Sequence, residues 1–319
     1  MENKELKAAS KKALEQYLGV KKEETLLIVS DETKREISHS LLEAGQGMCK
    51  EAFLCEMKSR EINGQEPPEQ ISELMTKVDV VICPTEKSLT HTDARRKAVS
   101  YGTRVATMPG ITVDTMVRCL NADADKVIDL TKKIASKLRN ASEIRVVTKS
   151  GTDITMPMKD RKVLESTGVL LNKGDWGNLP SGEVYLAPWE EKSNGIIVVD
   201  GSFAGIGMLE EPITIEVKNG FAEKITGGKQ AEKLIEMLDK VGRDARAIAE
   251  FGVGTNYLAQ LCGEILEDEK VYGTIHIAVG NNVSMGGNIN VKSHLDGLVK
   301  LPDVYLDGVL IMKEGVLLD

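Results

Sequence analysis

Apolar runs and helical segments alternate through the first 110 residues, and this alternation constrains the fold more than any other feature of the sequence. The runs at residues 25–30, 52–55, 78–82 and 104–108 have the length and composition of buried strands, and segments of helical spacing separate them. Strands that alternate with helices in this way pair in parallel, in a sheet that helices cover on both faces. We therefore expect an α/β fold whose N-terminal domain has a flavodoxin-like parallel sheet.

The turn after the first of these strands argues against a nucleotide site in the sheet. A dinucleotide-binding fold carries the pattern G-x-G-x-x-G at this place. Here the turn is Ser30-Asp31-Glu32-Thr33, which has no glycine and places two carboxylates where a pyrophosphate would lie. Asp31 is instead a candidate N-cap for the helix that follows, as Thr92 or Asp93 is for the helix before the fourth strand.

The pattern of predicted secondary structure changes near residue 140. A helix over about 123–139 precedes the change, and short β-runs with glycine-rich turns follow it, beginning with a hairpin over 144–156. One long helix, over about 229–241, interrupts these strands. We expect an α/β N-terminal domain at 1–140 and, at 141–319, a mainly β (α+β) C-terminal domain that binds metal and carries catalysis.

Net charge and cysteine content exclude several classes of protein. The formal net charge of −8 leaves no basic footprint for nucleic acid or an anionic membrane surface. No apolar run approaches the roughly 20 residues of a membrane span, and the N-terminal residues lack the apolar core of a signal peptide. The five cysteines are scattered without a C-x-x-C pair, which favours a reducing compartment over disulfides or a thiolate zinc site. We expect a cytoplasmic protein with a small-molecule or short-peptide substrate and no nucleic-acid or membrane partner.

Two of the four histidines lie in unusual company in the second half of the chain. His276 alternates with Ile275 and Ile277, so that on a strand its side chain points away from the isoleucines. His294 and Asp296 form a His-x-Asp pattern, which on an extended segment brings an imidazole and a carboxylate within reach of one cation. Metal hydrolases and the two-His-one-carboxylate iron triad use the same arrangement. An ordinary interpretation also fits each of these residues. His276 is then a core or surface histidine, and Asp296 only orients His294.

Two glutamates complete a candidate metal site. Glu250 has small and apolar neighbours, and an isolated buried carboxylate is costly unless a proton, a cation or a metal compensates it. Glu183 begins a strand just after a turn, where a solvent-facing role is equally consistent. Oxygen and imidazole ligands suit divalent zinc, cobalt, manganese or iron. The predicted metal ligands are Glu183, Glu250, His276, His294 and Asp296.

Six strings spread over both halves carry a resemblance to a known family. They are Leu-Thr-His-Thr-Asp-Ala-Arg-Arg at 89–96, Gly-Thr-Arg-Val-Ala-Thr-Met-Pro-Gly-Ile-Thr at 102–112, and the strings at 178–188, 249–254, 276–280 and 294–297. Together they resemble the aminopeptidase T / aminopeptidase S family of metallo-exopeptidases, of which this chain would be a compact, divergent member. The resemblance implies a homodimer whose five ligands hold two divalent ions, with Glu183 or Glu250 as the catalytic base.

The first predicted function is therefore a metal-dependent aminopeptidase or related amide hydrolase acting on small peptides with a free N-terminus. Three carboxylates and a bridging hydroxide would balance two ions of zinc, cobalt or manganese, and the hydroxide would be the nucleophile. One departure weakens this function. The family has a tyrosine seven residues after its first site histidine, whereas Val283 stands here.

The alternative is a mononuclear non-heme iron dioxygenase, because the resemblance extends to a branch of ring-cleaving 2,5-dihydroxypyridine dioxygenases that use one ferrous ion. His276, His294 and Asp296 would then hold the iron. Glu183 and Glu250 would lack a second metal, so they should have raised pKa values or pair with lysine or arginine. A third alternative, a non-catalytic relative that kept the fold, does not explain why five ligand types occur together.

Overall fold

The computed structural model describes residues 4–319, which form two compact units. The first unit comprises Met1–Ala124 and Ser166–Ser181, and the second comprises Asp125–Glu165 and Gly182–Asp319. The sequence-based division at residue 140 differs from these units in two segments. It places the helix before residue 140 in the first domain, whereas the structure places it in the second unit. It places residues 166–181 in the second domain, whereas the structure places them in the first unit. As a division into independently folding domains, 1–140 and 141–319 stays a prediction.

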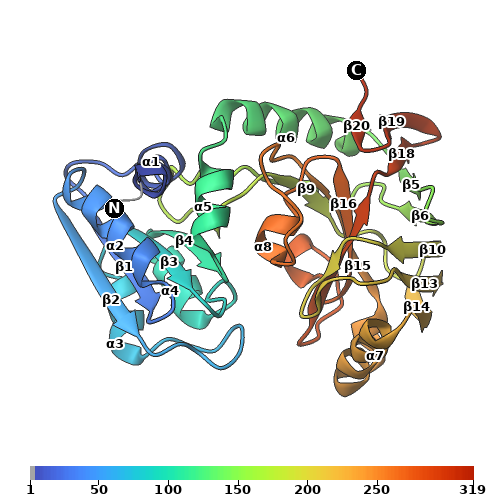
Figure 1. The fold of residues 1–319 in the computed structure, drawn as a ribbon, viewed down its shortest axis with the longest axis horizontal. Helices are drawn as coiled ribbons and strands as arrows, with labels where there is room; N and C mark the ends of the chain where they lie inside the picture. Colours follow the sequence, from blue (N-terminus) through green and yellow to red (C-terminus); the bar gives the residue numbers. More distant parts are fainter. Residues whose placement is uncertain (1–3) are drawn as a thin grey trace. The chain divides into compact units, whose positions relative to one another are not determined.

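The first unit is built on one five-stranded parallel sheet (Figure 1). Its strand order, β2-β1-β3-β4-β8, is the flavodoxin-like order. The strands are β1 (Thr25–Asp31), β2 (Glu51–Met57), β3 (Val80–Thr85), β4 (Arg104–Pro109) and β8 (Trp176–Asn178). The first four fall on the predicted apolar runs, whereas β8 comes from a later segment that no pattern had marked as a strand. The predicted α/β class with a parallel sheet is confirmed.

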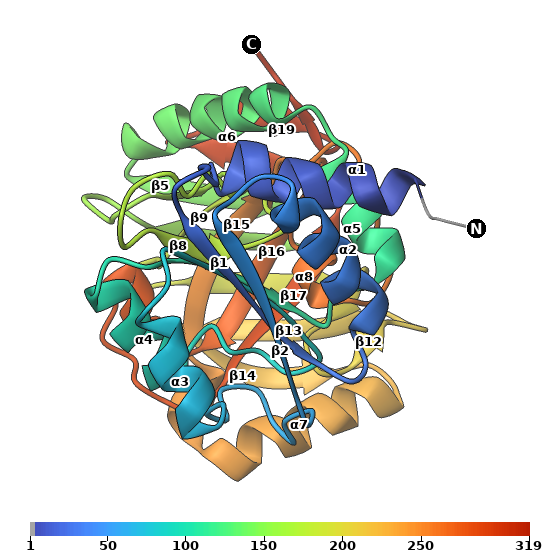
Figure 2. The same cartoon turned by 90° about the vertical axis from the view of Figure 1, so that its left-hand side faces the viewer.

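Helices lie on both faces of this sheet (Figure 2). On one face, Met75 of α3 and Ala94 and Ala98 of α4 share a core with Leu27 and Val81 of the sheet. The helices of the unit are α1 (Lys4–Lys12), continued by the π-helical turn η1 (Ala13–Tyr17), α2 (Arg35–Gln46), α3 (Glu69–Met75), α4 (Asp93–Ser100) and α5 (Val113–Leu120).

One of the two predicted helix caps is confirmed and the other is wrong. Thr92 caps α4, because its side-chain oxygen accepts a hydrogen bond from the backbone N–H of Arg95. Asp31 does not cap α2, which begins only at Arg35. Its carboxylate instead accepts hydrogen bonds from Thr33 and from the backbone N–H of Glu86, and so closes the turn after β1.

The second unit contains two antiparallel sheets that share one hydrophobic core. The eight-stranded sheet comprises β14 (Phe221–Thr226), β13 (Ile213–Lys218), β10 (Asn194–Val199), β6 (Asp153–Pro157), β5 (Glu143–Val147), β18 (Asp303–Leu306), β19 (Val309–Lys313) and β20 (Val316–Leu317). The seven-stranded sheet comprises β12 (Gly207–Met208), β11 (Ser202–Phe203), β17 (His294–Lys300), β16 (Thr274–Gly280), β15 (Ile248–Gly254), β9 (Glu183–Leu186) and β7 (Leu164–Ser166). The predicted hairpin over 144–156 is β5 and β6.

Two long helices pack against this core. Ile134 and Leu138 of α6, and Leu234 and Leu238 of α7, belong to the same buried cluster as the inner faces of both sheets. The helical elements are α6 (Ala124–Arg139), α7 (Lys229–Val241), α8 (Ile265–Asp268) and the short 3₁₀ turns η2 (Arg243–Arg246) and η3 (Val283–Met285). Both long helices had been predicted at these positions. No helix in the described part of the chain is long and apolar enough to cross a membrane.

Candidate metal centre

The seven-stranded sheet has one apolar face and one face that carries ionisable side chains. On β16, Ile275, Ile277 and Val279 lie in the hydrophobic core, so His276 projects from the opposite face. This orientation of the histidine is the predicted one. The adjacent strands have the same polarity, since Val253 of β15 also lies in the core. The predicted site residues come from four neighbouring strands: Glu183 from β9, Glu250 from β15, His276 from β16, and His294 and Asp296 from β17.

A β-bulge places Glu250 on the ionisable face. Ile248 pairs with Val279, but Glu250 pairs with the very next residue of β16, Ala278, so that β15 holds one extra residue at Ala249. The bulge lets Ile248 and Phe251 both face the core although they are three positions apart. Glu250 then lies on the same face as its neighbours from the other strands.

The five predicted residues form one continuous cluster. His276 Nε2 lies 3.5 Å from Glu183 Oε2 and 3.2 Å from Glu250 Oε1. His294 Nε2 lies 3.1 Å from Glu250 Oε2 and 3.5 Å from Asp296 Oδ1. His276 is fully buried, whereas 32% of the His294 side chain is exposed, so the cluster reaches solvent at His294. The expectation that all five converge holds, and ligation of a metal by them stays a proposal.

Gly252 makes room for the imidazole of His276. The two residues are cross-strand partners, and a β-carbon added at Gly252 would lie 1.9 Å from His276 Nε2. Any side chain at this position would occupy the space that the ring now fills. Glycine at 252 is therefore required by the placement of the histidine on the neighbouring strand.

The orientation of His294 is fixed by the backbone. Its Nδ1 lies 2.7 Å from the carbonyl oxygen of Asn281. Because a carbonyl oxygen only accepts, Nδ1 carries a proton, and the neutral ring then has its lone pair on Nε2, which faces Glu250 and Asp296. A histidine that donates its second ring N–H to a backbone carbonyl is the usual arrangement of a metal ligand.

The electrostatics of the cluster favour positive charge where the imidazole nitrogens converge. Burial alone would lower the pKa of His276, but the hydrogen bond and negative charge of Glu250, with the charges of Glu183 and Asp296, outweigh it and raise the pKa to about 9. Burial opposes the charged form of His294 too, yet the charge of Asp296 and its contact with Glu250 raise its pKa well above the usual range. Burial would raise the pKa of Glu250, and hydrogen bonds from both histidines instead lower it to about 2.

These residues fit a divalent metal ion. Asp296 Oδ1 and His276 Nδ1 are buried without a hydrogen bond among residues 4–319, so the cluster does not satisfy its own polar atoms. Ligand atoms of Glu250, His276 and Asp296 lie within 4.8 Å of one another. Two imidazoles with carboxylates are the ligand types of iron, zinc, cobalt and manganese sites.

We expect the affinity for such an ion to rise with pH. Metal binding requires neutral imidazoles, and the metal-free cluster holds His276 protonated up to about pH 9. Below that pH a metal must displace the proton, which costs about tenfold in affinity per pH unit for one proton and up to about a hundredfold for two. Titration calorimetry with Mn²⁺ at pH 6, 7, 8 and 9 measures the slope, and buffers of different ionisation enthalpy measure the proton release. An affinity independent of pH over this range would show that protons and metal do not compete.

Lys270 and Glu269, which no sequence pattern had marked, border the cluster, and Tyr185 borders it as well. Lys270 is fully buried, its Nζ lies 2.8 Å from Glu183 Oε1, and it also forms an ion pair with Glu269. Burial would lower the pKa of Lys270, but the charges of Glu183 and Glu269 raise it above its usual value. Burial raises the pKa of Glu269 to about 8, whereas the ammonium of Lys270 acts in the opposite direction and favours the ionised carboxylate. Tyr185 lies beside Glu183 on the site face, and burial together with the nearby carboxylates raises its pKa, so its phenol stays protonated.

Comparison with known proteins gives a family for the whole described chain. The model of the family NicX, 2,5-dihydroxypyridine 5,6-dioxygenase, matches residues 5–319. The 2,5-dihydroxypyridine 5,6-dioxygenase of Pseudomonas putida KT2440 is 26% identical over 242 residues, which cover 71% of this chain and 68% of the relative. Aminopeptidase T of Thermus aquaticus is 25% identical over 181 residues, which cover 50% of this chain and 43% of that enzyme.

Two solved structures share the fold over the whole length. The 2,5-dihydroxypyridine dioxygenase of Pseudomonas putida KT2440 superposes with a TM-score of 0.83 at 20% identity, covering 100% of this chain and 98% of that one. Aminopeptidase T of Thermus thermophilus superposes with a TM-score of 0.72 at 17% identity, covering 99% of each chain. At these identities the likeness establishes the fold alone.

These comparisons correct the first predicted function. The resemblance to aminopeptidase T is real but distant, and the prediction of a hydrolase is wrong, because the family that matches nearly every residue is one of dioxygenases, which are oxidoreductases. The strings that carried the resemblance occur in a fold common to both groups. By its match over residues 5–319, the chain belongs to the 2,5-dihydroxypyridine 5,6-dioxygenase family.

Proposed function

We propose that this protein is a ring-cleaving dioxygenase that uses one ferrous ion and acts on a hydroxylated pyridine, with 2,5-dihydroxypyridine as the first substrate to test. The observation that carries the proposal is the group of two imidazoles and a carboxylate that projects from one face of two adjacent strands, in a chain of this family. Two histidines and one carboxylate are the ligand set of non-heme Fe(II) oxygenases, which leaves coordination positions open for substrate and dioxygen.

His276, His294 and Asp296 would hold the iron. They lie on two paired strands, β16 and β17, so their spacing is set by the ladder and not by a loop. Bound there, a ferrous ion would supply the redox chemistry that allows dioxygen to react with an aromatic ring. The carbonyl of Asn281 keeps the proton of His294 on Nδ1 and so leaves Nε2 free to bind.

Glu250 would accept the proton of a ring hydroxyl of the substrate. Its carboxylate lies between the two histidines, with one oxygen close to each Nε2. A carboxylate beside the metal can accept the hydroxyl proton as the substrate binds, which increases the electron density of the ring. Tyr185, protonated because of its burial and the neighbouring carboxylates, offers a hydrogen-bond donor on the same face.

Glu183 has the lysine partner that the one-metal alternative predicted for it. That alternative required each glutamate outside the triad to have a raised pKa or a lysine or arginine partner. Glu183 pairs with buried Lys270. For Glu250 the condition is wrong: among residues 4–319 it has no lysine or arginine partner, and hydrogen bonds from His276 and His294 lower its pKa to about 2.

The test is turnover of 2,5-dihydroxypyridine by protein loaded with Fe²⁺ under air. We expect oxygen uptake equal to substrate loss, and, with ¹⁸O₂, label from both oxygen atoms in the ring-opened product. Protein without iron is the control. Release of amino acids from unblocked peptides, with no oxygen uptake on any hydroxylated pyridine, would overturn the proposal. The homodimer expected from the resemblance stays a prediction, which light scattering checks.

A further inference from the structure

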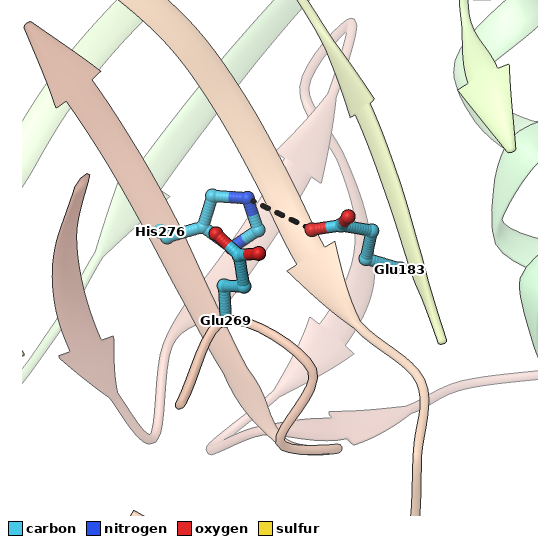
Figure 3. A group of neighbouring side chains, drawn as sticks. All are labelled: Glu183, Glu269 and His276. Carbon is cyan, nitrogen blue, oxygen red and sulfur yellow. Dashed lines mark ion pairs between the residues drawn. The ribbon is translucent and has the colours of Figure 1, made fainter. Parts of the chain in front are cut away.

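A second metal-compatible group borders the first. Ligand atoms of Glu183, Glu269 and His276 lie within 4.8 Å of one another, as do those of Glu250, His276 and Asp296. Figure 3 shows the three side chains of the second group pointing toward one another from β9, from the segment after α8 and from β16. The two groups share His276, so ions bound to both groups would be close neighbours, as in a two-metal centre.

Lys270 already supplies a cation to this second group. Its ammonium contacts one oxygen of Glu183 at 2.8 Å and one of Glu269. Both carboxylates that a second metal would need are therefore bound to a positive charge that belongs to the chain. The lysine side chain is completely buried, so bulk solvent does not screen these contacts.

We propose that Lys270 is an internal cation that occupies the second half of an otherwise two-metal site and thereby restricts the protein to one ion. The inference rests on the proposed function in one respect, that His276, His294 and Asp296 hold a metal. It goes beyond that function because it names the residue that sets the number of ions.

The backbone holds the ammonium in this position. A β-carbon added at Gly254 of β15 would lie 2.2 Å from the carbonyl oxygen of Val271, so the strand packs directly against the segment that carries Lys270. The carbonyl of Lys270 accepts a hydrogen bond from the N–H of Asn256 at 2.9 Å. Asp268 lies two residues before Lys270 and is buried. It accepts hydrogen bonds from Ser202 and from the N–H groups of Cys262 and Gly263.

Physical chemistry favours the tethered ammonium over a second free ion. A divalent ion entering the second group would compete with the ammonium for Glu183 and Glu269, and a buried lysine left without a partner is strongly unfavourable. The ammonium has no lone pair with which to bind a metal, and it repels one at close range. The centre can therefore fill with a single ion even when metal is abundant.

The experiment counts Mn²⁺ ions bound to metal-free protein by equilibrium dialysis and elemental analysis. Wild type should bind one ion. Lys270→Met, which keeps the length of the side chain but removes the charge, should bind two, with the electron-spin coupling of a neighbouring Mn²⁺ pair. Lys270→Arg, which keeps the charge, should still bind one. The matched control is Lys34→Met, because Lys34 is a nearly buried lysine that pairs with Glu86 at 2.8 Å in the first unit.

Each outcome bears on the proposal. One ion in Lys270→Met would overturn it, as would two ions in wild type. If Lys270→Met folds poorly, Lys270→Gln takes its place, and the proposal requires either variant to fold once millimolar Mn²⁺ replaces the lost cation. Failure of both to fold with Mn²⁺ present would also overturn it. A wild type that binds no ion contradicts the proposed function itself, and is thus distinguishable from failure of the role of Lys270.

Discussion

Replacing His294 with alanine is expected to abolish metal binding and dioxygenase activity while leaving the fold intact. The substitution removes one of three proposed ligands, and loss of even an outer partner of a ligand typically costs about 10–100-fold in metal affinity or activity. We therefore expect more than a roughly 100-fold fall in both. His294 pairs with the buried carboxylates of Glu250 and Asp296, so its loss should lower the free energy of unfolding of the metal-free protein by about 1–3 kcal/mol without abolishing the fold. Calorimetry with Fe²⁺ or Mn²⁺, oxygen uptake and thermal unfolding measure the three quantities.

His39→Ala is the matched control for this variant. His39 lies exposed on α2 in the first unit, where its Nδ1 contacts the carbonyl of Arg35. The control should bind metal and turn over substrate as wild type does. A His294→Ala protein that retains one tightly bound ion would show that His294 is not a ligand, and the triad would have to be redrawn around Glu250.

Replacing Gly252 with alanine should disable the centre without touching a ligand. The added methyl group would lie 1.9 Å from His276 Nε2, so the imidazole must leave its position between Glu250 and Glu183. We expect a fall in metal affinity of more than roughly 100-fold, as for loss of the ligand itself. Overpacking at a buried position should also lower the free energy of unfolding by about 1–3 kcal/mol. Metal titration and denaturant unfolding of the metal-free protein separate these two effects.

Gly177→Ala provides the comparison, because Gly177 is also a strand glycine, in β8 of the first unit. There an added β-carbon meets nothing closer than Leu170 at 3.4 Å, which is ordinary contact. That variant should bind metal normally and lose little stability. Normal metal affinity in Gly252→Ala would mean that the ring of His276 can bind from another position, and would remove the argument for glycine at 252.

The parts of the fold that the sequence predicts are those in which local pattern and tertiary structure agree. The four apolar runs of the first unit, the hairpin of β5 and β6 and helix α7 all bury a continuous apolar face, so the pattern of each is visible locally. β8 is different, because Trp176–Asn178 is short and pairs with β4, which lies far from it in sequence. Only the tertiary pairing makes that segment a strand.

The candidate site divides in the same way. Alternation on β16 and the His-x-Asp pattern on β17 are local, and they identify His276, His294 and Asp296 correctly as neighbours. The bulge at Ala249 breaks the period of two, so the sequence alone could not assign Glu250 to a face. Lys270 follows Glu267, Asp268 and Glu269, a charged run that is typical of a solvent-exposed segment. Its burial depends on the glycine of β15 against which it packs, and no neighbour in the sequence signals that.

The sequence ranked the hydrolase above the dioxygenase, and this ranking is wrong because two groups of enzymes share one scaffold. The ligand types and the matching strings are compatible with both a hydrolase and an oxygenase. Charge balance over five ligands favoured two ions and hence the hydrolase. That count omitted Lys270 and Glu269, which the sequence gives no reason to include.

The proposed ligands project from the middle of a sheet whose opposite face is the hydrophobic core of the second unit. Ile277 and His276 are consecutive residues of one strand, so a shift of the strand that repacks the core also moves the imidazole. The positions of the metal-binding atoms therefore depend on the packing of the core, which is dense and resists deformation. Surface loops, by contrast, can lengthen or change composition without moving these atoms. A lineage with this architecture is free to alter the molecule it recognises while the reacting centre stays where the strands hold it.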